Sequence, residues 1–231
     1  LKDASAAAVY GARAAYGVIL VTTKNGKVGK TNVSYNGRFS FGDTTTSTDF
    51  ETRGYYSAGI NDMFYKTYQG VPYTHYTQED YHELWIRRND KVEDPSRPWV
   101  VEKNGEYKYY GNFDWYNCLF DNTRPTWEHN LTVSGGTEKV KYMLSGNYYN
   151  QKGIIRIDPD RFKKYTFRSK TIANITSWFE LSNNTSYYHS EYTYPGLSGV
   201  NDVFTRAGRH ALASIVPMHP DGTLVYRTGL T

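Results

Sequence analysis

The chain has 231 residues, of which 39% are hydrophobic and 16% aromatic, with 23 tyrosines. Disordered chains lack aromatic and β-branched residues, so this composition indicates a folded protein, and its polar, tyrosine-rich character favours antiparallel β structure with solvated faces. The formal net charge of +4 is small and no basic tract carries it, so a nucleic-acid-binding surface is not indicated.

Two further observations narrow the class of protein. The single cysteine, Cys118, cannot form a disulfide within the chain, so the cysteine framework of small secreted domains does not apply. No apolar run approaches the roughly 18 residues of a membrane-spanning helix. A membrane-spanning β-strand needs only about ten alternating residues, so that class stays open.

The chain begins, without an initiator methionine, in a segment of small residues, LKDASAAAVYGARAAYG. It continues as a β-branched run over residues 18–23, which predicts a strand that ends at Asn25-Gly26. Such a beginning is typical of the interior of a longer protein.

Residues 31–42, TNVSYNGRFSFG, form the clearest predicted strand. Hydrophobic or small residues alternate with polar ones almost without a break, which is the pattern of a strand with one apolar and one polar face. The predicted apolar face carries Val33, Tyr35, Gly37, Phe39 and Phe41.

The connection over residues 43–129 is far longer than usual, which indicates added structure or function. Capping-box patterns that begin at Thr48 and at Thr77 predict two short helices, which run to about Phe64 and about Trp85.

Polar, proline-bearing residues 91–98 predict a loop after the second of these helices. The dipeptide Asn104-Gly105 predicts a small hairpin over residues 99–110.

The rest of the chain predicts four more strands and a helix. Residues 130–150 predict a hairpin that turns at GGTE, and residues 162–175 and 178–192 predict two strands joined tightly at Thr176-Ser177. Residues 201–215 predict a helix that Pro217 ends.

Short turns and long connections alternate along this series of strands. The two tight turns would lie at one rim of a sheet, and residues 43–129, 152–160 and 191 onward at the opposite rim. Outer-membrane barrels have this arrangement, with short periplasmic turns, long outer loops, and strands that place apolar side chains outward and polar ones toward the lumen.

Two blocks of the sequence resemble a known family. The opening LKDASAAAVYGARAAYGVILVTTKNGK resembles the end of the plug domain in SusC/RagA-type TonB-dependent outer-membrane transporters of Bacteroidetes-type bacteria. FDWYNCLFDNTRPTWEHNLTVSGGTEKVKYMLSGNYYNQKGII and KKYTFRSKTIANITSWFELSNNTSY resemble the strands that follow it. One departure is Tyr16, where the family more often has Asn.

The resemblance implies an all-β fold, as a segment of a 22-stranded transmembrane antiparallel β-barrel with a plug and long outer loops carrying short helices. It implies that residues 1–28 are the C-terminal end of the plug domain and that residues 29–231 are the N-terminal part of the barrel. Outer loop regions would then occupy residues 43–129 and 191–231. About five strands cannot close a barrel, so we expect the chain to be a piece of a longer protein.

The resemblance also implies the function: TonB-dependent active import of glycans or oligopeptides across the cell outer membrane, within a SusCD-type complex. The implied partners are a SusD-like surface lipoprotein, TonB through an N-terminal segment absent here, the substrate and outer-membrane lipid, with no nucleic acid. No catalytic, cofactor or metal site is expected, because no acid, base, nucleophile or metal-ligand spacing converges in the sequence.

The resemblance and the strand alternation together suggest three groups of functional residues. The plug-end motif comprises Leu1, Lys2, Asp3, Tyr10, Gly11, Arg13 and Gly17. The predicted lumen-facing residues are Arg38, Lys141, Asn147 and Arg168. The candidate contacts with substrate or with the lipoprotein lid are Tyr73, Tyr76, Trp99, Tyr109, Trp115 and Tyr194.

Two alternatives remain open from the sequence. Strand aromatics such as Tyr142 and Tyr187 fit either an interfacial girdle that anchors a barrel in the bilayer or stacking platforms for sugars or peptide side chains. A soluble carbohydrate-binding β module would also have tyrosine-rich strands and loops. Such a module would not expose Val33, Tyr35 and Phe39 together, so the exposure of that face discriminates between the two classes.

Overall fold

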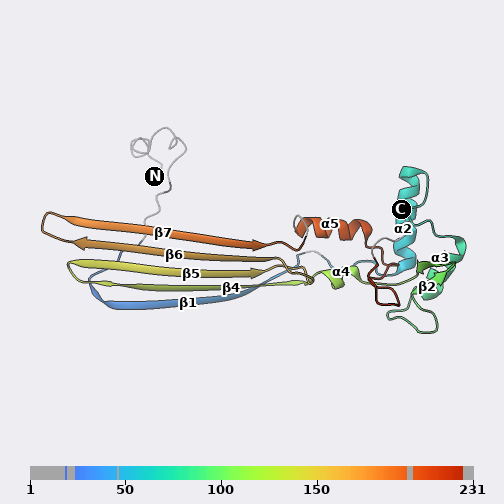
Figure 1. Cartoon of the computed structure of the whole chain (residues 1–231), viewed down its shortest axis with the longest axis horizontal. Helices are drawn as coiled ribbons and strands as arrows, with labels where there is room; N and C mark the ends of the chain where they lie inside the picture. The colour runs from blue at the N-terminus through green and yellow to red at the C-terminus, as the bar shows by residue number, and fades with distance from the viewer. Residues whose placement is uncertain (1–18, 20–23, 46, 197–199, 226–231) are drawn as a thin grey trace. The chain divides into compact units, whose positions relative to one another are not determined.

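The computed structural model describes residue 19 and residues 24–45, 47–196 and 200–225 (Figure 1). The strand predicted over residues 18–23 lies outside this part of the chain, apart from Ile19. The described residues form a five-stranded sheet, a two-stranded sheet and four helices.

The larger sheet is antiparallel and confirms the predicted strands. Its strands lie side by side in the order β1-β4-β5-β6-β7, as Figure 1 shows. Their bounds are Gly29–Asp43 for β1, Thr123–Gly136 for β4, Val140–Lys152 for β5, Arg161–Asn174 for β6 and Glu180–Thr193 for β7. Because β4 begins at Thr123, the connection after β1 is shorter than the predicted residues 43–129.

The tight turns of this sheet are also confirmed. Between β4 and β5, the Thr137 N–H donates to the Val140 carbonyl at 2.7 Å. Gly136 has a φ of 158°, and a Cβ there would lie 2.4 Å from the same carbonyl oxygen, so only glycine fits. Between β6 and β7, the Ile175 N–H donates to the Phe179 carbonyl at 2.9 Å.

The chain divides into two compact units. The sheet unit comprises the described residues among Leu1–Arg38, Glu128–Tyr148 and Lys164–His189. The loop unit comprises the described residues among Phe39–Trp127, Tyr149–Lys163 and Ser190–Thr231.

The loop unit contains the helices and the small hairpin. Its elements are α2 (Gly54–Gln69), α3 (Gln78–Arg87), β2 (Val100–Lys103), β3 (Glu106–Tyr109), α4 (Trp115–Leu119) and α5 (Val200–His210). Two groups of buried residues form its core, one around Trp99, Tyr109 and Ile215 and the other around Ala58, Leu84 and Tyr110. The sequence did not predict α4, although Asp114 is a typical N-cap and accepts from the Asn117 N–H at 2.9 Å.

Two of the loop-unit predictions are confirmed by the structure. Thr77 and Asp80 form the predicted capping box at the start of α3. The β2–β3 hairpin turns at Asn104 and Gly105, which have φ values of 55° and 79°, as an Asn-Gly turn of this type requires.

The predicted start of the first helix is wrong. The helix α2 begins at Gly54, and its N-cap, Arg53, makes no side-chain capping bond. A distant segment replaces the predicted cap, because the Gly54 N–H donates to Asn112 Oδ1 at 2.8 Å. A Cβ at Gly54 would lie 2.1 Å from the Gly111 carbonyl oxygen, so this approach requires glycine.

The predicted end of the last helix is also wrong. The helix α5 ends at His210, five residues before the predicted position. The following segment, residues 211–216, instead packs into the core and pairs with residues 111–113. The Gly111 N–H donates to the Ser214 carbonyl and the Phe113 N–H to the Ala213 carbonyl, both at 2.8 Å. These tertiary bonds replace the helical bonds that the local pattern favours.

Candidate functional site

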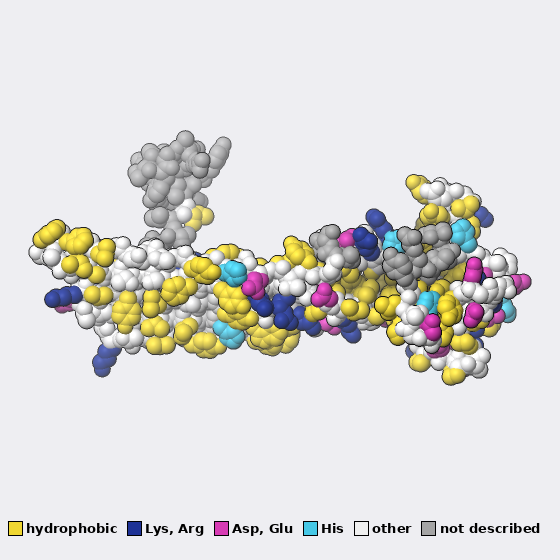
Figure 2. All heavy atoms as spheres, viewed as in Figure 1, with side chains coloured by type: hydrophobic (Ala, Val, Ile, Leu, Met, Phe, Trp, Pro, Cys, Tyr) yellow, Lys and Arg dark blue, Asp and Glu magenta, His cyan; other side chains and the backbone are white. Residues whose placement is uncertain are grey.

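One face of the sheet unit carries a row of neighbouring rings, one from each strand, of which three of the four adjacent pairs are stacked and the Tyr148–Tyr165 pair is tilted. In strand order the rings belong to Tyr35, His129, Tyr148, Tyr165 and His189. Neighbouring ring centroids are 6.1, 6.2, 5.2 and 6.1 Å apart. Figure 2 shows histidine side chains among hydrophobic ones over these strands. We call these five residues the ring row.

The face that carries the ring row is apolar and exposed. Val33 and Tyr35 are 63% and 64% exposed, and Phe167 is 47% exposed. Every second residue of a strand lies on the same face. Between the ring row and the tight turns, none of the described strand residues on this face of the sheet unit is Asp, Glu, Lys or Arg. Such a face matches a lipid-facing surface better than a water-facing one.

The opposite face of the sheet unit is polar. Arg38 on β1 forms an ion pair with Glu128 on β4. Asn147 on β5 donates to Glu128 Oε1 at 3.1 Å and to Asn130 Oδ1 at 2.6 Å. Two predicted lumen-facing residues therefore share one network across three strands.

The other two predicted lumen-facing residues lie on the strands of the same sheet. Lys141 is half-buried near the start of β5, and Arg168 is exposed on β6. By alternation Lys141 shares the face of Asn147. That this face lines a lumen stays a prediction.

Five of the six candidate ligand contacts belong to the packing of the loop unit. Trp99 and Tyr109 are 8% and 6% exposed and lie in one core cluster, against which Tyr73 packs. The Tyr76 hydroxyl donates to the Tyr109 carbonyl at 2.7 Å, and burial raises its pKa. This packing leaves little ring surface on Trp99 and Tyr109 exposed, and contact of these residues with substrate or lid stays a prediction.

Trp115 and Tyr194 differ from the buried rings. Trp115 packs against the same core and donates its indole N–H to the Leu212 and Ile215 carbonyls at 3.1 and 2.9 Å, yet it also lines a pocket. Tyr194 is 57% exposed and packs edge-on against Tyr192 with 4.5 Å between ring centroids. Their role as ligand contacts stays a prediction.

Two buried carboxylates organise the other core cluster. Asp62 accepts from the Thr74 and Tyr81 hydroxyls, both at 2.6 Å. Asp80 accepts from the Tyr110 hydroxyl at 2.5 Å as well as from Thr77.

The pKa values in this cluster follow from burial and from these hydrogen bonds. Burial raises the pKa of the Tyr81 and Tyr110 hydroxyls, and the carboxylates raise it further, so both stay protonated donors. Burial also raises the pKa of Asp80, but the bonds from Tyr110 and Thr77 outweigh burial and hold it below the usual value. Every donor faces an acceptor, so the cluster is a structural feature of the core.

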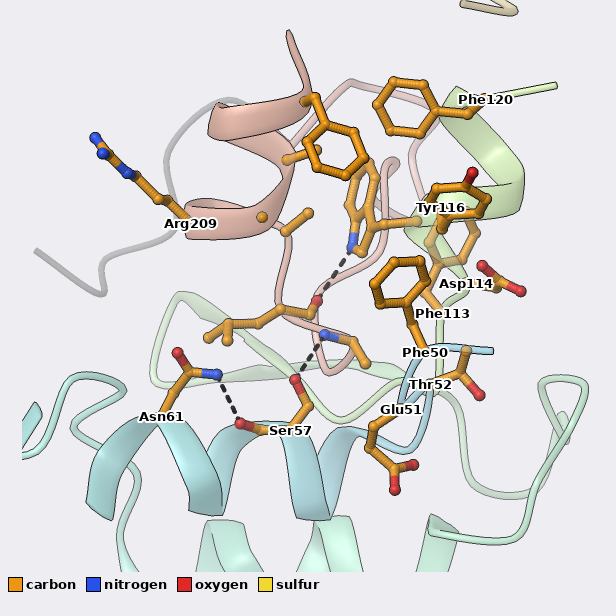
Figure 3. Close-up of a pocket in the computed structure, with 17 residues that line it drawn as sticks. Phe50, Glu51, Thr52, Ser57, Asn61, Phe113, Asp114, Tyr116, Phe120 and Arg209 are labelled. Carbon is orange, nitrogen blue, oxygen red and sulfur yellow. Dashed lines mark hydrogen bonds between the residues drawn. The ribbon is translucent and has the colours of Figure 1, made fainter. Parts of the chain in front are cut away.

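The loop unit also contains an aromatic pocket of about 240 Å³, shown in Figure 3. Its walls come from the segment before α2, from α2, from residues 113–120 and from residues 204–213. The aromatic residues that line it are Phe50, Phe113, Trp115, Tyr116, Phe120 and Phe204. Glu51 and Asp114 lie at one side, whereas Arg209 points away from the rings (Figure 3). No sequence pattern predicted this pocket, because its walls are up to 163 residues apart in the chain.

A second, polar pocket of about 810 Å³ shares Phe50, Glu51, Thr52 and Asp114 with the aromatic pocket. Its other lining residues are Asp49, Arg53, Arg88, Asn89, Asp90, Lys91 and Asn112. Residues 50–52 therefore border an apolar pocket and a charged one.

The plug-end motif residues lie outside the described part of the chain. No group of three or more His, Cys, Asp or Glu within the described residues could hold a metal ion. None of the helices that the structure describes has both the length and the apolar character that a membrane-spanning helix needs.

Sequence comparison identifies the relatives of the chain, although no model of a protein family matches it. The TonB-dependent receptor SusC of Bacteroides thetaiotaomicron is 31% identical over 167 residues, which are 72% of this chain and 13% of SusC. A TonB-dependent receptor of Formosa agariphila is 30% identical over 169 residues, which are 73% of this chain and 14% of that receptor. The chain belongs to the SusC/RagA family of TonB-dependent receptors.

Solved structures of family members agree in fold. A structure of the RagAB peptide transporter matches 99% of this SusC/RagA-family chain with a TM-score of 0.62 and 22% identity. The RagAB peptide importer in its open-open state matches 82% of the chain with a TM-score of 0.53 and 25% identity. The chain covers 26% and 21% of these two proteins, respectively.

The relatives of the chain are transport proteins rather than enzymes. The relatives are named as receptors, transporters and importers, so the SusC/RagA-family chain is not assigned to an enzyme class. The chain spans 13% and 14% of the length of the two curated relatives described above.

Proposed function

We propose that this chain is part of a transporter that imports oligopeptides or glycans across the bacterial outer membrane, powered through TonB. A SusD-like surface lipoprotein would cover the substrate entrance, and the sheet would be part of a 22-stranded barrel. Residues 1–28 would end the plug, and residues 29–231 would begin the barrel and its outer loops.

The single observation that carries the proposal is the difference between the two faces of the sheet unit. One face bears the ring row and exposed apolar residues such as Val33, and the other bears the network of Arg38, Glu128 and Asn147. A barrel wall needs this combination, because lipid covers one face and water or the plug covers the other. Family membership supports the same interpretation.

The same observation argues against the soluble carbohydrate-binding module. A soluble sheet of this kind would bury one face in a core, yet Val33, Tyr35 and Phe39 are 63%, 64% and 53% exposed. Together with their neighbours they form an apolar surface that water would not favour.

We propose that the loop unit lies on the outer surface, where it would meet the substrate or the lipoprotein. Its residues 44–122 leave β1 and return to the neighbouring strand β4, whereas the turns at the other ends of the strands are short. Long connections at one rim and short turns at the other are the arrangement of outer-membrane barrels.

Site-directed labels on the full-length transporter test the orientation of the faces. In a full-length background from which Cys118 and any other native cysteine have been removed, single cysteines replace Tyr142 and Phe167 on the apolar face, and Lys141 and Arg168 on the polar face. Labels at the first pair should report lipid, and labels at the second pair should report water or plug. The reverse result would mean that the assignment of faces is wrong.

Energy dependence tests the transport function itself. Cells that express the full-length transporter should accumulate substrate only when TonB is functional and the partner lipoprotein is present. Uptake that persists without TonB would refute the proposed function.

A further inference from the structure

The aromatic pocket of the loop unit is built from segments that are distant in the sequence and meet only in the folded chain. Phe120 is 1% exposed, whereas Phe50 and Phe204 are each 50% exposed at the pocket. The rings of Phe120 and Phe204 lie 5.6 Å apart, and those of Phe50 and Tyr116 lie 4.8 Å apart. The pocket therefore has a fixed aromatic wall and two accessible rings.

Several of the polar groups that line this pocket have partners inside the protein. Carbonyls of residues 212 and 215 accept from Trp115 Nε1. The Ser57 hydroxyl accepts from the Ala213 N–H at 3.4 Å, and Asn61 donates to the Ser57 carbonyl at 2.9 Å (Figure 3). Asp114 accepts twice from Asn117.

This arrangement disfavours a sugar in the pocket. Each sugar hydroxyl that leaves water needs a new hydrogen-bond partner, because an unpaired polar group costs free energy when it is buried. The Ser57, Asn61 and Asp114 groups of the lining are already engaged within the protein. An apolar or aromatic group makes no such demand and gains from packing on the rings.

The volume of the aromatic pocket limits how much of a ligand it takes. At about 240 Å³ it is smaller than the roughly 300–1,000 Å³ of pockets that enclose a drug-sized molecule. It suits one side chain, and the remainder of the ligand must lie outside.

The polar pocket provides a place for that remainder. It adjoins the aromatic pocket at residues 50–52 and contains both cationic and anionic side chains. Arg53 pairs with Glu51 and Arg88 lies over the Trp85 ring, but no described contact involves the exposed Lys91. A ligand that fits both pockets has an apolar group at one end and a polar, charged part beside it. A peptide has this character, with an apolar side chain next to a polar main chain and a terminal carboxylate.

We propose that the aromatic pocket binds one apolar side chain of an oligopeptide while the polar pocket receives the peptide main chain and its carboxylate. The inference rests on the proposed import function and assigns its substrate class. The loop unit would thus select peptides with a large apolar residue over neutral oligosaccharides.

Glycine 208 offers a direct test, because a side chain at this position would occupy the pocket. Gly208 lines the pocket on the face of α5 that also carries Phe204, four residues earlier. A Cβ built there meets no atom within 4 Å, so Gly208→Leu fits without a clash at its first atom. Gly59 in α2 is equally open but does not line the pocket, so Gly59→Leu is the matched control.

Binding is measured on the purified full-length transporter with its lipoprotein, by calorimetric titration with defined probes. The probes are a short synthetic peptide with one leucine, the same peptide with serine in place of leucine, and a neutral oligosaccharide. We expect the leucine peptide to bind about tenfold more tightly than the serine peptide, the discrimination of a hydrophobic pocket. Gly208→Leu should remove this preference, and Gly59→Leu should keep it.

A second variant changes the pocket in the opposite direction. Phe204→Ala removes one accessible ring and should also weaken binding of the leucine peptide. Phe64→Ala is its control, since Phe64 is 65% exposed on α2 and lies outside the pocket. If either pocket variant is poorly folded, as judged by protease resistance of the loop unit, the other decides the result.

Three outcomes would overturn the inference. These are equal binding of the leucine and serine peptides, wild-type peptide affinity in both pocket variants, and loss of lipoprotein association with peptide binding unchanged. The last outcome would make the pocket a contact with the lipoprotein. TonB-dependent uptake of substrate is measured in parallel. If there is no such uptake, the proposed import function is refuted. If uptake continues but one of the three outcomes above is found, only the peptide pocket is refuted.

Discussion

Removal of a single hydroxyl, by Tyr110→Phe, should loosen the loop unit by a predictable amount. Tyr110 is fully buried, and its hydroxyl donates to the carboxylate of Asp80, itself 6% exposed, at 2.5 Å. A hydrogen bond to a charged group contributes about 1.5–3 kcal/mol, and phenylalanine keeps the ring while it leaves the carboxylate one donor short. We therefore expect the free energy of local unfolding of α3 and the β2–β3 hairpin to fall by about 1.5–3 kcal/mol.

Amide hydrogen exchange on the full-length protein measures this change. Since each 1.4 kcal/mol corresponds to a factor of ten, exchange of the protected amides in α3 should accelerate by roughly 10-fold to 150-fold. Tyr68→Phe is the control, because Tyr68 is 81% exposed on α2. Equal exchange rates in the Tyr110→Phe and Tyr68→Phe variants would refute the claim that the Asp80 bond stabilises this core.

Three more predictions test other parts of the structure. Gly54→Ala should destabilise the loop unit by about 1–3 kcal/mol, because its Cβ would lie 2.1 Å from the Gly111 carbonyl oxygen. Gly59→Ala should stabilise α2 by about 0.5–1 kcal/mol, because a Cβ there meets no atom within 4 Å; resistance to protease at increasing temperature compares the two variants. Against the effect of burial, hydrogen bonds from Tyr110 and Thr77 hold the folded-state pKa of Asp80 below its usual value, so its contribution to stability should be complete above that usual value and be lost as the pH falls through the lowered one. Exchange of α3 amides at matched intrinsic rates should show this loss, and Asp80→Asn should abolish the pH dependence. Leu131→Arg, on the apolar face of β4, should cost about 2–4 kcal/mol of barrel stability in lipid, while Thr132→Arg on the opposite face should cost less; similar losses in urea titrations would contradict the lipid-facing assignment.

Local sequence patterns determined the strands and several turns of this protein. Period-two alternation predicted all five strands of the large sheet, because the side chains of a strand point to opposite faces whatever lies beyond it. The Thr77–Asp80 capping box and the Asn104-Gly105 turn were predicted for the same reason. Their hydrogen bonds and φ angles involve residues only a few positions apart.

Tertiary structure alone decided how the aromatic residues are used and where two helices end. Trp99 and Tyr109 looked suited to a ligand, but the fold buries them against residues 212–216. Asn112 and Gly111 set the start of α2, and the bonds of residues 213 and 214 to residues 111 and 113 accompany the early end of α5. Burial depends on which distant segments meet, and their contacts outweigh helix preferences of less than about 1 kcal/mol per residue. The aromatic pocket depends on the same long-range meeting of segments, so the order of residues along the chain could not reveal it.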